Sequence, residues 1–229
     1  MPHSYYIPLI QKFEIQGDPE RAAGMKKYMK GHFDYYGIPT PLRQEITRDF
    51  LKKFGMPEMN ILEDVCWSLW EEPMRECQYT VLFLLNRLKK KLSIENLPLI
   101  ESLITSKSWW DTVDGLAAWM VGAIFQKHPE AIIPKTSEWM ASDNIWLQRT
   151  CLIFQLTYKK NTDTALLFNF IETLSDHKLF WIRKAIGWAL REYSKTDPDV
   201  VLAFVNSHQL APLSRREALK IIEKNKTRD

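Results

Sequence analysis

Glycine and cysteine are scarce in this sequence of 229 residues, and each scarcity excludes a class of structure. Only eight glycines are present, which argues against a turn-rich β-sandwich or barrel. The three cysteines, Cys66, Cys77 and Cys151, form no Cys-x-x-Cys pair, so we expect no structural zinc site. Their odd number and wide spacing indicate reduced, mostly buried thiols in a cytosolic protein.

Long apolar runs and common cofactor motifs are also missing. No window approaches 18 continuous apolar residues, so we expect no membrane span. Residues 1–10 contain no basic segment followed by an apolar stretch, so we expect no signal peptide and a cytosolic location. There is no Gly-rich phosphate loop and no His-Glu-x-x-His, and the five histidines are scattered. We therefore expect neither a metal nor a cofactor.

The charge and the aromatic content leave room for a polyanionic partner. The formal net charge is +3 and the isoelectric point is about 8.6, which permits such a partner without requiring one. Nine tryptophans must belong either to the core or to a binding surface. Hydrophobic residues make up 45% and charged residues 26%, as is ordinary for a soluble globular domain.

Helical periodicity dominates the chain. Residues 143–158 and 180–193 carry apolar side chains at helical spacing. Lys127-His128-Pro129-Glu130 and Thr196-Asp197-Pro198-Asp199 end one helix and place a proline in the first turn of the next. No pair of segments has the pattern of a hairpin. The sequence therefore predicts an all-α protein.

A repeat is visible in the segments that open helices. Met74, Trp110, Trp146 and Trp181 each begin such a segment, at intervals of 36, 36 and 35 residues. A fixed period of this length is typical of stacked helix pairs that curve around a concave surface. We expect one domain over residues 1–229, with capping helices to about residue 54, HEAT-like repeats over about 55–219, and a frayed tail over 220–229.

Trp110 and Asp114 are the first candidate pair for chemistry. Ser108-Trp109-Trp110-Asp111 looks like a capping box, and residues four apart on the following helix share a face. An indole beside a carboxylate could form a site. A half-buried aromatic beside a solvated acid explains the same spacing.

Three cations form the second group of candidates. Arg149 lies near the positive end of its helix dipole, where a cation is unfavourable unless a phosphate or a carboxylate pairs with it. The alternative is an exposed arginine whose stem packs on Trp146. Lys184, Trp188 and Arg191 share one helical stripe, as in a nucleic-acid surface. An ordinary amphipathic rim has the same pattern.

Longer segments resemble the AlkD-type alkylpurine DNA glycosylases, a HEAT-like repeat family. The resemblance is carried by the runs at residues 105–114, 141–149, 184–188, 190–193, 210–214 and 28–30, which read TSKSWWDTVD, ASDNIWLQR, KAIGW, LREY, LAPLS and YMK. These segments have the order and spacing of the family and cover nearly the whole chain.

The resemblance implies a right-handed solenoid of HEAT-like helix pairs whose concave, basic face holds duplex DNA. It places Trp110, Asp114 and Trp188 at the lesion, with Asp114 as the catalytic acid. It makes Arg149 a support for that acid or a contact to a phosphate, and it brings Tyr28 to the DNA backbone. Lys184 and Arg191 are softer candidates for phosphate contacts.

The expected activity is that of a monomeric, monofunctional DNA glycosylase without a cofactor, acting on N3- and N7-alkylated purines such as 3-methyladenine and 7-methylguanine. Two alternatives stay open. One is a non-catalytic module of the same fold that binds branched or distorted DNA. The other is a protein-interaction scaffold, which the stripe of Lys184, Trp188 and Arg191 disfavours.

Overall fold

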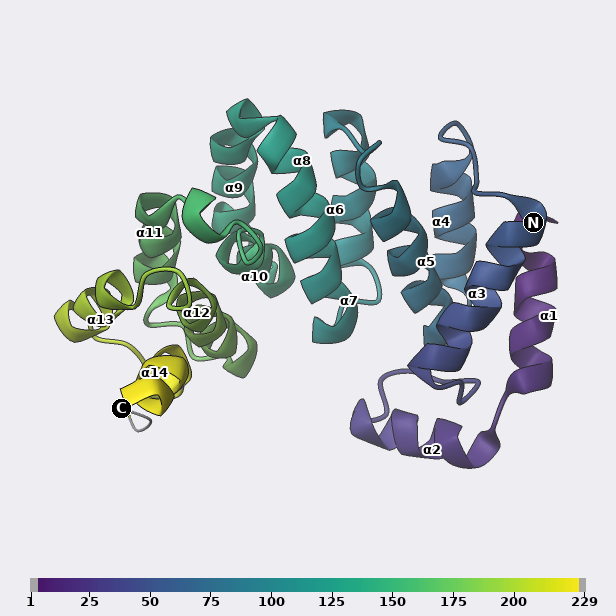
Figure 1. Cartoon of the computed structure of the whole chain (residues 1–229), viewed down its shortest axis with the longest axis horizontal. Coiled ribbons are helices and arrows are strands. Elements are labelled where there is room, and N and C mark those ends of the chain that lie inside the picture. The colour runs from purple at the N-terminus through teal and green to yellow at the C-terminus, as the bar shows by residue number, and fades with distance from the viewer. Residues whose placement is uncertain (1–3, 227–229) are drawn as a thin grey trace. The chain divides into compact units, whose positions relative to one another are not determined.

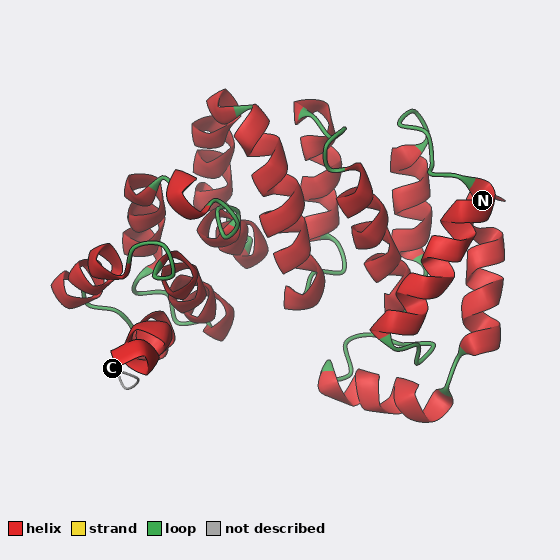
Figure 2. Cartoon of the chain, viewed as in Figure 1, coloured by secondary structure: helices red, strands yellow, loops and turns green. Residues whose placement is uncertain are grey.

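The computed structural model describes residues 4–226, and these residues form helices, turns and loops without any named strand (Figure 2). The all-α class is confirmed. No helix in this part of the chain is both long and apolar enough to span a membrane. The chain divides into two compact units, Met1–Leu88 and Lys89–Asp229. The expectation of a single domain stays a prediction.

The first unit contains the N-terminal helices. Helix α1 packs on α3, and α3 and α4 both pack on α5. Pro39 is the N-cap of α3, and Thr40 is its first residue. The elements of this unit are η1 (Ser4–Tyr6), α1 (Ile7–Gln16), α2 (Pro19–Tyr28), α3 (Thr40–Phe54), α4 (Leu62–Glu71) and α5 (Arg75–Leu88) (Figure 1).

A buried carboxylate fixes the loop between α2 and α3. Glu76 on α5 accepts hydrogen bonds from the backbone N–H groups of Tyr36, Gly37 and Ile38, at 2.9–3.1 Å. Gly37 has φ +89°, and a Cβ there would lie 2.0 Å from the carbonyl oxygen of Asp18. Only glycine fits that position, because an added methylene would overlap the backbone of α2.

The second unit is a stack of helices in which α10, α12 and α14 pack on one another in succession, while α9, α11 and α13 lie beside them. One continuous helical run holds α7, a π-helical turn η3 and α8. The elements are η2 (Ile94–Asn96), α6 (Leu97–Thr105), α7 (Trp110–Gly115), η3 (Leu116–Val121), α8 (Gly122–Lys127), η4 (Pro129–Ala131), α9 (Ile132–Ala141), α10 (Ile145–Ile153), η5 (Lys159–Asn161), α11 (Thr164–Leu174), α12 (Phe180–Tyr193), α13 (Pro198–Ser207) and α14 (Pro212–Lys226).

The repeat is more regular than the sequence motifs indicated. Helices α5, α7, α10 and α12 begin at Arg75, Trp110, Ile145 and Phe180, each 35 residues after the one before. The predicted opening residues lie within one position of these helix starts. The repeat is therefore set by the positions at which the helices begin, and the tryptophans lie at or near those positions.

The C-terminal segment is helical over part of the expected tail. Helix α14 continues through Lys226, and residues 227–229 of the predicted tail lie outside the described residues. Ile222 is buried beyond the expected boundary at residue 220, and an apolar side chain buried in the last turns helps to hold a helix in place. The fraying of this tail stays a prediction.

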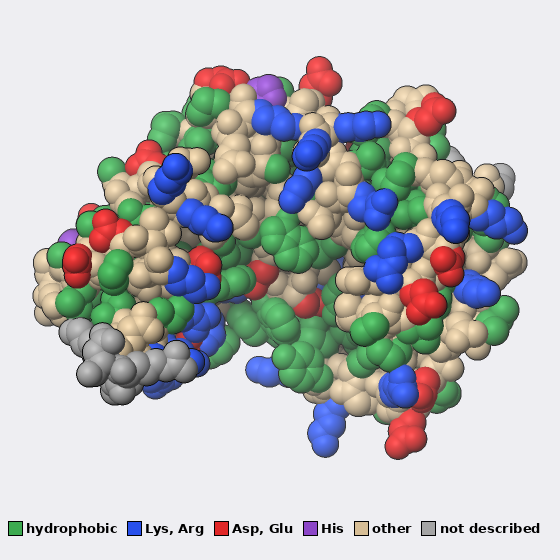
Figure 3. Space-filling view, viewed as in Figure 1, with side chains coloured by type: hydrophobic (Ala, Val, Ile, Leu, Met, Phe, Trp, Pro, Cys, Tyr) green, Lys and Arg blue, Asp and Glu red, His purple; other side chains and the backbone are tan. Residues whose placement is uncertain are grey.

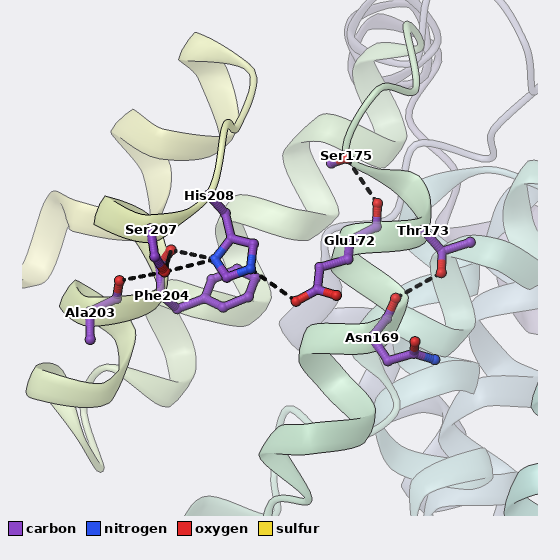
Figure 4. Close-up of polar contacts among 8 residues, drawn as sticks. All are labelled: Asn169, Glu172, Thr173, Ser175, Ala203, Phe204, Ser207 and His208. Atoms are coloured by element: carbon purple, nitrogen blue, oxygen red, sulfur yellow. Dashed lines mark hydrogen bonds and ion pairs between the residues drawn. The ribbon is translucent and has the colours of Figure 1, made fainter.

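A polar clasp joins α11 and α13. His208, just after α13, lies with Nε2 3.0 Å from a carboxylate oxygen of Glu172 on α11 and with Nδ1 2.9 Å from the Phe204 carbonyl (Figure 4). The Ser207 hydroxyl donates to the carbonyl oxygen of Ala203 within α13. The pair of His208 and Glu172 thus links the end of α13 to α11.

Candidate active site

Helix α7, which carries Asp114, begins at Trp110, one residue later than a cap at Ser108 would place it. Trp109 is the N-cap of α7, with extended backbone and no side-chain cap hydrogen bond. The Ser108 hydroxyl instead donates to the carbonyl oxygen of Ile104 at 2.6 Å. The predicted capping box at Ser108 and Asp111 is therefore wrong, because Ser108 lies outside the helix start that the box requires.

Asp114 is held by a two-pronged hydrogen bond from Arg149 on α10. The guanidinium Nε donates to Oδ1 at 2.7 Å, and a terminal nitrogen donates to Oδ2 at 2.8 Å. The two side chains are 3% and 15% exposed. Charge-assisted pairs of this geometry fix orientation as well as charge. The partner that compensates the cation of Arg149 near the start of its helix is thus a carboxylate.

Two further contacts hold Arg149 itself. Its remaining terminal nitrogen donates to the carbonyl oxygen of Trp181 at 2.6 Å, and its guanidinium carbon lies 6.0 Å from the ring centre of Trp188. With these partners and its burial, Arg149 supports the acid. This geometry favours that role over the alternative role as a contact to phosphate.

The electrostatics of the acid follow from burial and from its partner. Burial raises the pKa of the Asp114 carboxyl above the 3.8 of an ordinary aspartate, whereas the hydrogen bonds and charge of Arg149 oppose the rise. Arginine stays charged in proteins, so protonation of Asp114 would leave a buried cation without its carboxylate. The raised pKa makes Asp114 a stronger base than an exposed aspartate, while the ion pair with Arg149 favours its charged form.

The free side of Asp114 faces a cleft of about 340 Å³. Trp110 and Trp188, the two tryptophans that the family resemblance placed with the acid, both line it. A carboxylate has about four lone-pair sites, and Arg149 uses one on each oxygen. The others can accept hydrogen bonds from a water molecule or a substrate in the cleft.

Two residues of the cleft were not found from the sequence. Trp119, in the π-helical turn η3, and Glu192, near the end of α12, also line it. Glu192 pairs with Lys195 at 2.6 Å. Glu192 could have been found four residues after Trp188 on the same helix, whereas Trp119 stands five residues after Asp114 and so falls outside the α-helical pattern.

The stripe of Lys184, Trp188 and Arg191 contains an internal counter-ion. Glu217 on α14 accepts from Lys184 Nζ at 2.8 Å with one oxygen and from Arg191 with the other. Its pKa is lowered, chiefly by the hydrogen bond from Lys184. Basic side chains lie over α12 and α14 in the space-filling view (Figure 3). The stripe therefore carries one net positive charge rather than two.

Gly187 explains how Glu217 reaches the stripe. A Cβ at Gly187 would lie 2.6 Å from the Cβ of Glu217 and 2.8 Å from the carbonyl oxygen of Ser214. The Ser214 hydroxyl also donates to the carbonyl oxygen of Arg183 at 2.9 Å. Helices α12 and α14 thus pack closely at Gly187, which has no side chain to hold them apart.

The other tryptophans of the repeat form a separate cluster. Rings of Trp109, Trp146 and Trp181 lie 5.0–6.0 Å apart, centre to centre, at the starts of α7, α10 and α12. The residue that matches Trp146 and Trp181 is therefore Trp109. Trp110 lies one position further along, where it reaches the cleft beside Asp114.

Tyr28 belongs to the first unit. It ends α2 and is 73% exposed, and its approach to a DNA backbone stays a prediction. In the described residues, no group of three or more His, Cys, Asp or Glu side chains could hold a metal ion. The three cysteines are buried and unpaired by disulfides, and burial raises the pKa of the Cys66 thiol to about 12.

Comparison with known proteins identifies the family of the chain. The sequence model of the family described as DNA alkylation repair enzyme matches residues 9–222. A predicted DNA alkylation repair enzyme from Enterococcus faecalis is 32% identical with a TM-score of 0.83, over 89% of this chain and 95% of its own. None of the curated proteins compared with the chain matches it.

Two solved structures from Streptococcus mutans are more distant. AlkD2 is 18% identical with a TM-score of 0.58, over 79% of this chain and 88% of its own. The protein smu.31 is 18% identical with a TM-score of 0.57, over 77% of this chain and 95% of its own. At that identity the likeness shows the fold alone, as a helical repeat solenoid. The family match over most of its length shows that this chain belongs to the DNA alkylation repair enzyme family.

Proposed function

We propose that this protein is a monofunctional DNA N-glycosylase that hydrolyses the N-glycosidic bond of N3- and N7-alkylated purines in duplex DNA. The observation that carries the proposal is Asp114. It is a part-buried carboxyl group, hydrogen-bonded at both oxygens by Arg149, and it lines a cleft together with Trp110 and Trp188. This arrangement suits a reaction in which positive charge must be stabilised.

The chemistry follows from the charge of the lesion. A purine alkylated at N3 or N7 is a cation. When its bond to C1′ breaks, the ring takes the bonding electron pair and leaves as a neutral base. The sugar becomes cationic, water adds its oxygen to C1′, and the released proton passes to the carboxylate of Asp114 or to solvent. A positioned carboxylate stabilises the sugar and orients the water.

The two tryptophans add selectivity for the charged lesion. Indole faces attract cations by about 0.5–2 kcal/mol each, and more when water is excluded. Trp110 and Trp188 flank Asp114 in the cleft. A neutral purine would not gain this attraction. Because water is the nucleophile, the abasic product should remain as an intact strand.

Contacts to the DNA backbone are assigned to Lys184 and Arg191, with Tyr28 as a further contact. Lys184 and Arg191 remain partly exposed, at 34% and 23%, although both pair with Glu217. A phosphate can share these cations while their positions stay fixed by the carboxylate. We further propose that the protein acts as a monomer without metal or cofactor.

The direct test is release of free base from a duplex that carries one 7-methylguanine. Wild type and Asp111→Asn should release the base, whereas Asp114→Asn should be slower by about 10²–10⁴-fold, the usual contribution of such a group. Asp111 is the control because it is another carboxylate of the same cleft, whereas the carboxylate that Arg149 holds is that of Asp114. Thermal unfolding and DNA binding of each variant show whether it is folded.

Two outcomes would contradict the proposal. Release by Asp114→Asn at the wild-type rate would remove the acid from the mechanism. No release by wild type, together with intact DNA binding, would make the protein a non-catalytic DNA-binding module of the same fold.

A further inference from the structure

Arg43 is a half-buried cation without an acceptor for its N–H groups. It is the fourth residue of α3, and its guanidinium carbon lies 4.4 Å from the ring centre of Tyr79 on α5, a helix that packs against α3 (Figure 1). Within residues 4–226, the side chain of Arg43 donates no hydrogen bond and forms no ion pair. A guanidinium has five N–H donors, so partial burial without acceptors is unfavourable.

The neighbours of Arg43 do not compensate its charge fully. Burial lowers the pKa of the Arg43 guanidinium, and the nearby Tyr79 and Glu76 oppose that change only in part. The oxygens of Glu76 already accept from three backbone N–H groups of residues 36–38. Because arginine keeps its proton in proteins, the side chain remains a cation beside a carboxylate that is bound elsewhere.

Arg149 shows how the same chain compensates an arginine in a similar place. Both arginines lie near the start of a helix, where the dipole disfavours a cation. Arg149 donates to both oxygens of Asp114 and to a backbone carbonyl. Arg43 has no such acceptor among the described residues. A group from outside the chain can therefore supply what Arg43 lacks.

The position of Tyr79 and the shape of the guanidinium indicate the kind of group. Tyr79 is the fifth residue of α5, and the fifth residues of α7, α10 and α12 are Asp114, Arg149 and Lys184. Its hydroxyl lies 3.3 Å from that of Tyr35, which helps to fix the ring beneath the cation. A guanidinium pairs best with two oxygens of one anion, as in a phosphate. Negative charge is also favourable near the start of α3.

We propose that Arg43, stacked on Tyr79, is a phosphodiester-binding site of the first unit and holds one backbone phosphate of duplex DNA. The inference rests on the proposed function in taking duplex DNA as the substrate, but it requires neither a lesion nor catalysis. A phosphate contact adds affinity without reading base sequence. Arg43 therefore serves to hold the duplex, and the chemistry stays with Asp114.

The test measures binding of two undamaged duplexes of different sequence by fluorescence anisotropy over a range of salt concentrations. Arg43→Gln should weaken binding of both duplexes about tenfold, as expected for the loss of one hydrogen bond to a charged group. It should also reduce the slope of log affinity against log salt by about one, because one phosphate contact is lost. Arg43→Lys keeps the cation and should keep the wild-type slope.

Arg48→Gln is the matched control. Arg48 is an exposed arginine of the same helix, and no contact of its side chain occurs among the described residues. The variant loses the same charge but should keep the wild-type slope, because a side chain that touches no phosphate releases no counter-ion. Thermal unfolding shows whether each variant is folded.

A second measurement uses the wild-type protein alone and so does not depend on the folding of a variant. Phenylglyoxal modifies accessible arginines, and mass spectrometry locates the modified residues. Undamaged duplex should protect Arg43 from modification and leave Arg48 reactive.

Several results would overturn the inference. These are wild-type affinity in Arg43→Gln, an equal loss in Arg48→Gln, or weaker binding with an unchanged slope, which would assign Arg43 to structure. Equal protection of both arginines, no protection of Arg43, or no duplex binding by wild type would do the same. Failure of the proposed function looks different. Wild type would then release no base from the 7-methylguanine duplex, while its binding of undamaged DNA and the effect of Arg43→Gln would still be measurable.

Discussion

Replacing Arg149 with methionine should destabilise the protein through the acid it leaves behind. Arg149 is 3% exposed and Asp114 is 15% exposed, so solvent screens the pair little. Removing one partner of a buried ion pair costs about 3–5 kcal/mol, because the other charge remains buried without compensation. For a chain of this size, each kcal/mol lowers the unfolding midpoint by about 2–4 °C. The expected loss is therefore about 6–20 °C.

The measurement is thermal unfolding followed by circular dichroism, with two further variants. Arg183→Met is the control, since Arg183 donates one side-chain hydrogen bond, to the His177 carbonyl, and forms no described ion pair. It should shift the midpoint much less. The double variant Arg149→Met/Asp114→Asn has no unpaired buried charge and should be more stable than Arg149→Met alone.

Two results would refute this reasoning. One is an unfolding midpoint for Arg149→Met within about 2 °C of wild type. The other is a double variant no more stable than the single one, which would show that lost packing rather than the unpaired carboxylate causes the loss.

Three further predictions concern pH and packing. Base release should fall as pH falls through the raised pKa of Asp114, so the midpoint of the acid limb of the pH–rate profile should lie above 3.8, the pKa of an ordinary aspartate. A midpoint at or below that value would contradict the burial argument. Gly187→Ala should cost about 1–3 kcal/mol of unfolding free energy, because its Cβ would overlap Glu217. Gly24→Ala, with open space around it, should be neutral or stabilising by up to about 1 kcal/mol. Equal thermal unfolding midpoints for the two variants would argue against a forced contact at Gly187. The pKa of Glu217 is lowered, so its contribution to stability is complete above its ordinary value of 4.5 and is lost as pH falls through the lower folded value. The difference in unfolding midpoint between wild type and Glu217→Gln should shrink below pH 4.5, and a constant difference would show that the charge contributes nothing.

The sequence by itself determined the helical class, a repeat of 35 or 36 residues and the placement of Trp110 and Asp114 on one side of a helix. These features depend on residues close in the chain, and helical periodicity is a local property. The site positions carried over from the family resemblance were also available at that stage. The N-cap of α7 could not be predicted reliably, because Ser108 and Trp109 are adjacent and many short polar patterns resemble a capping box.

Only the tertiary structure decided which groups meet. Arg149 lies 35 residues from Asp114, and no local pattern chooses a carboxylate over a phosphate as its partner. Glu217 reaches Lys184 and Arg191 because Gly187 lets two helices touch. Trp119 enters the cleft through a π-turn that interrupts the α-helical register. Contacts between distant segments and breaks in helical period both arise from packing, which is why residue spacing alone could not reveal them.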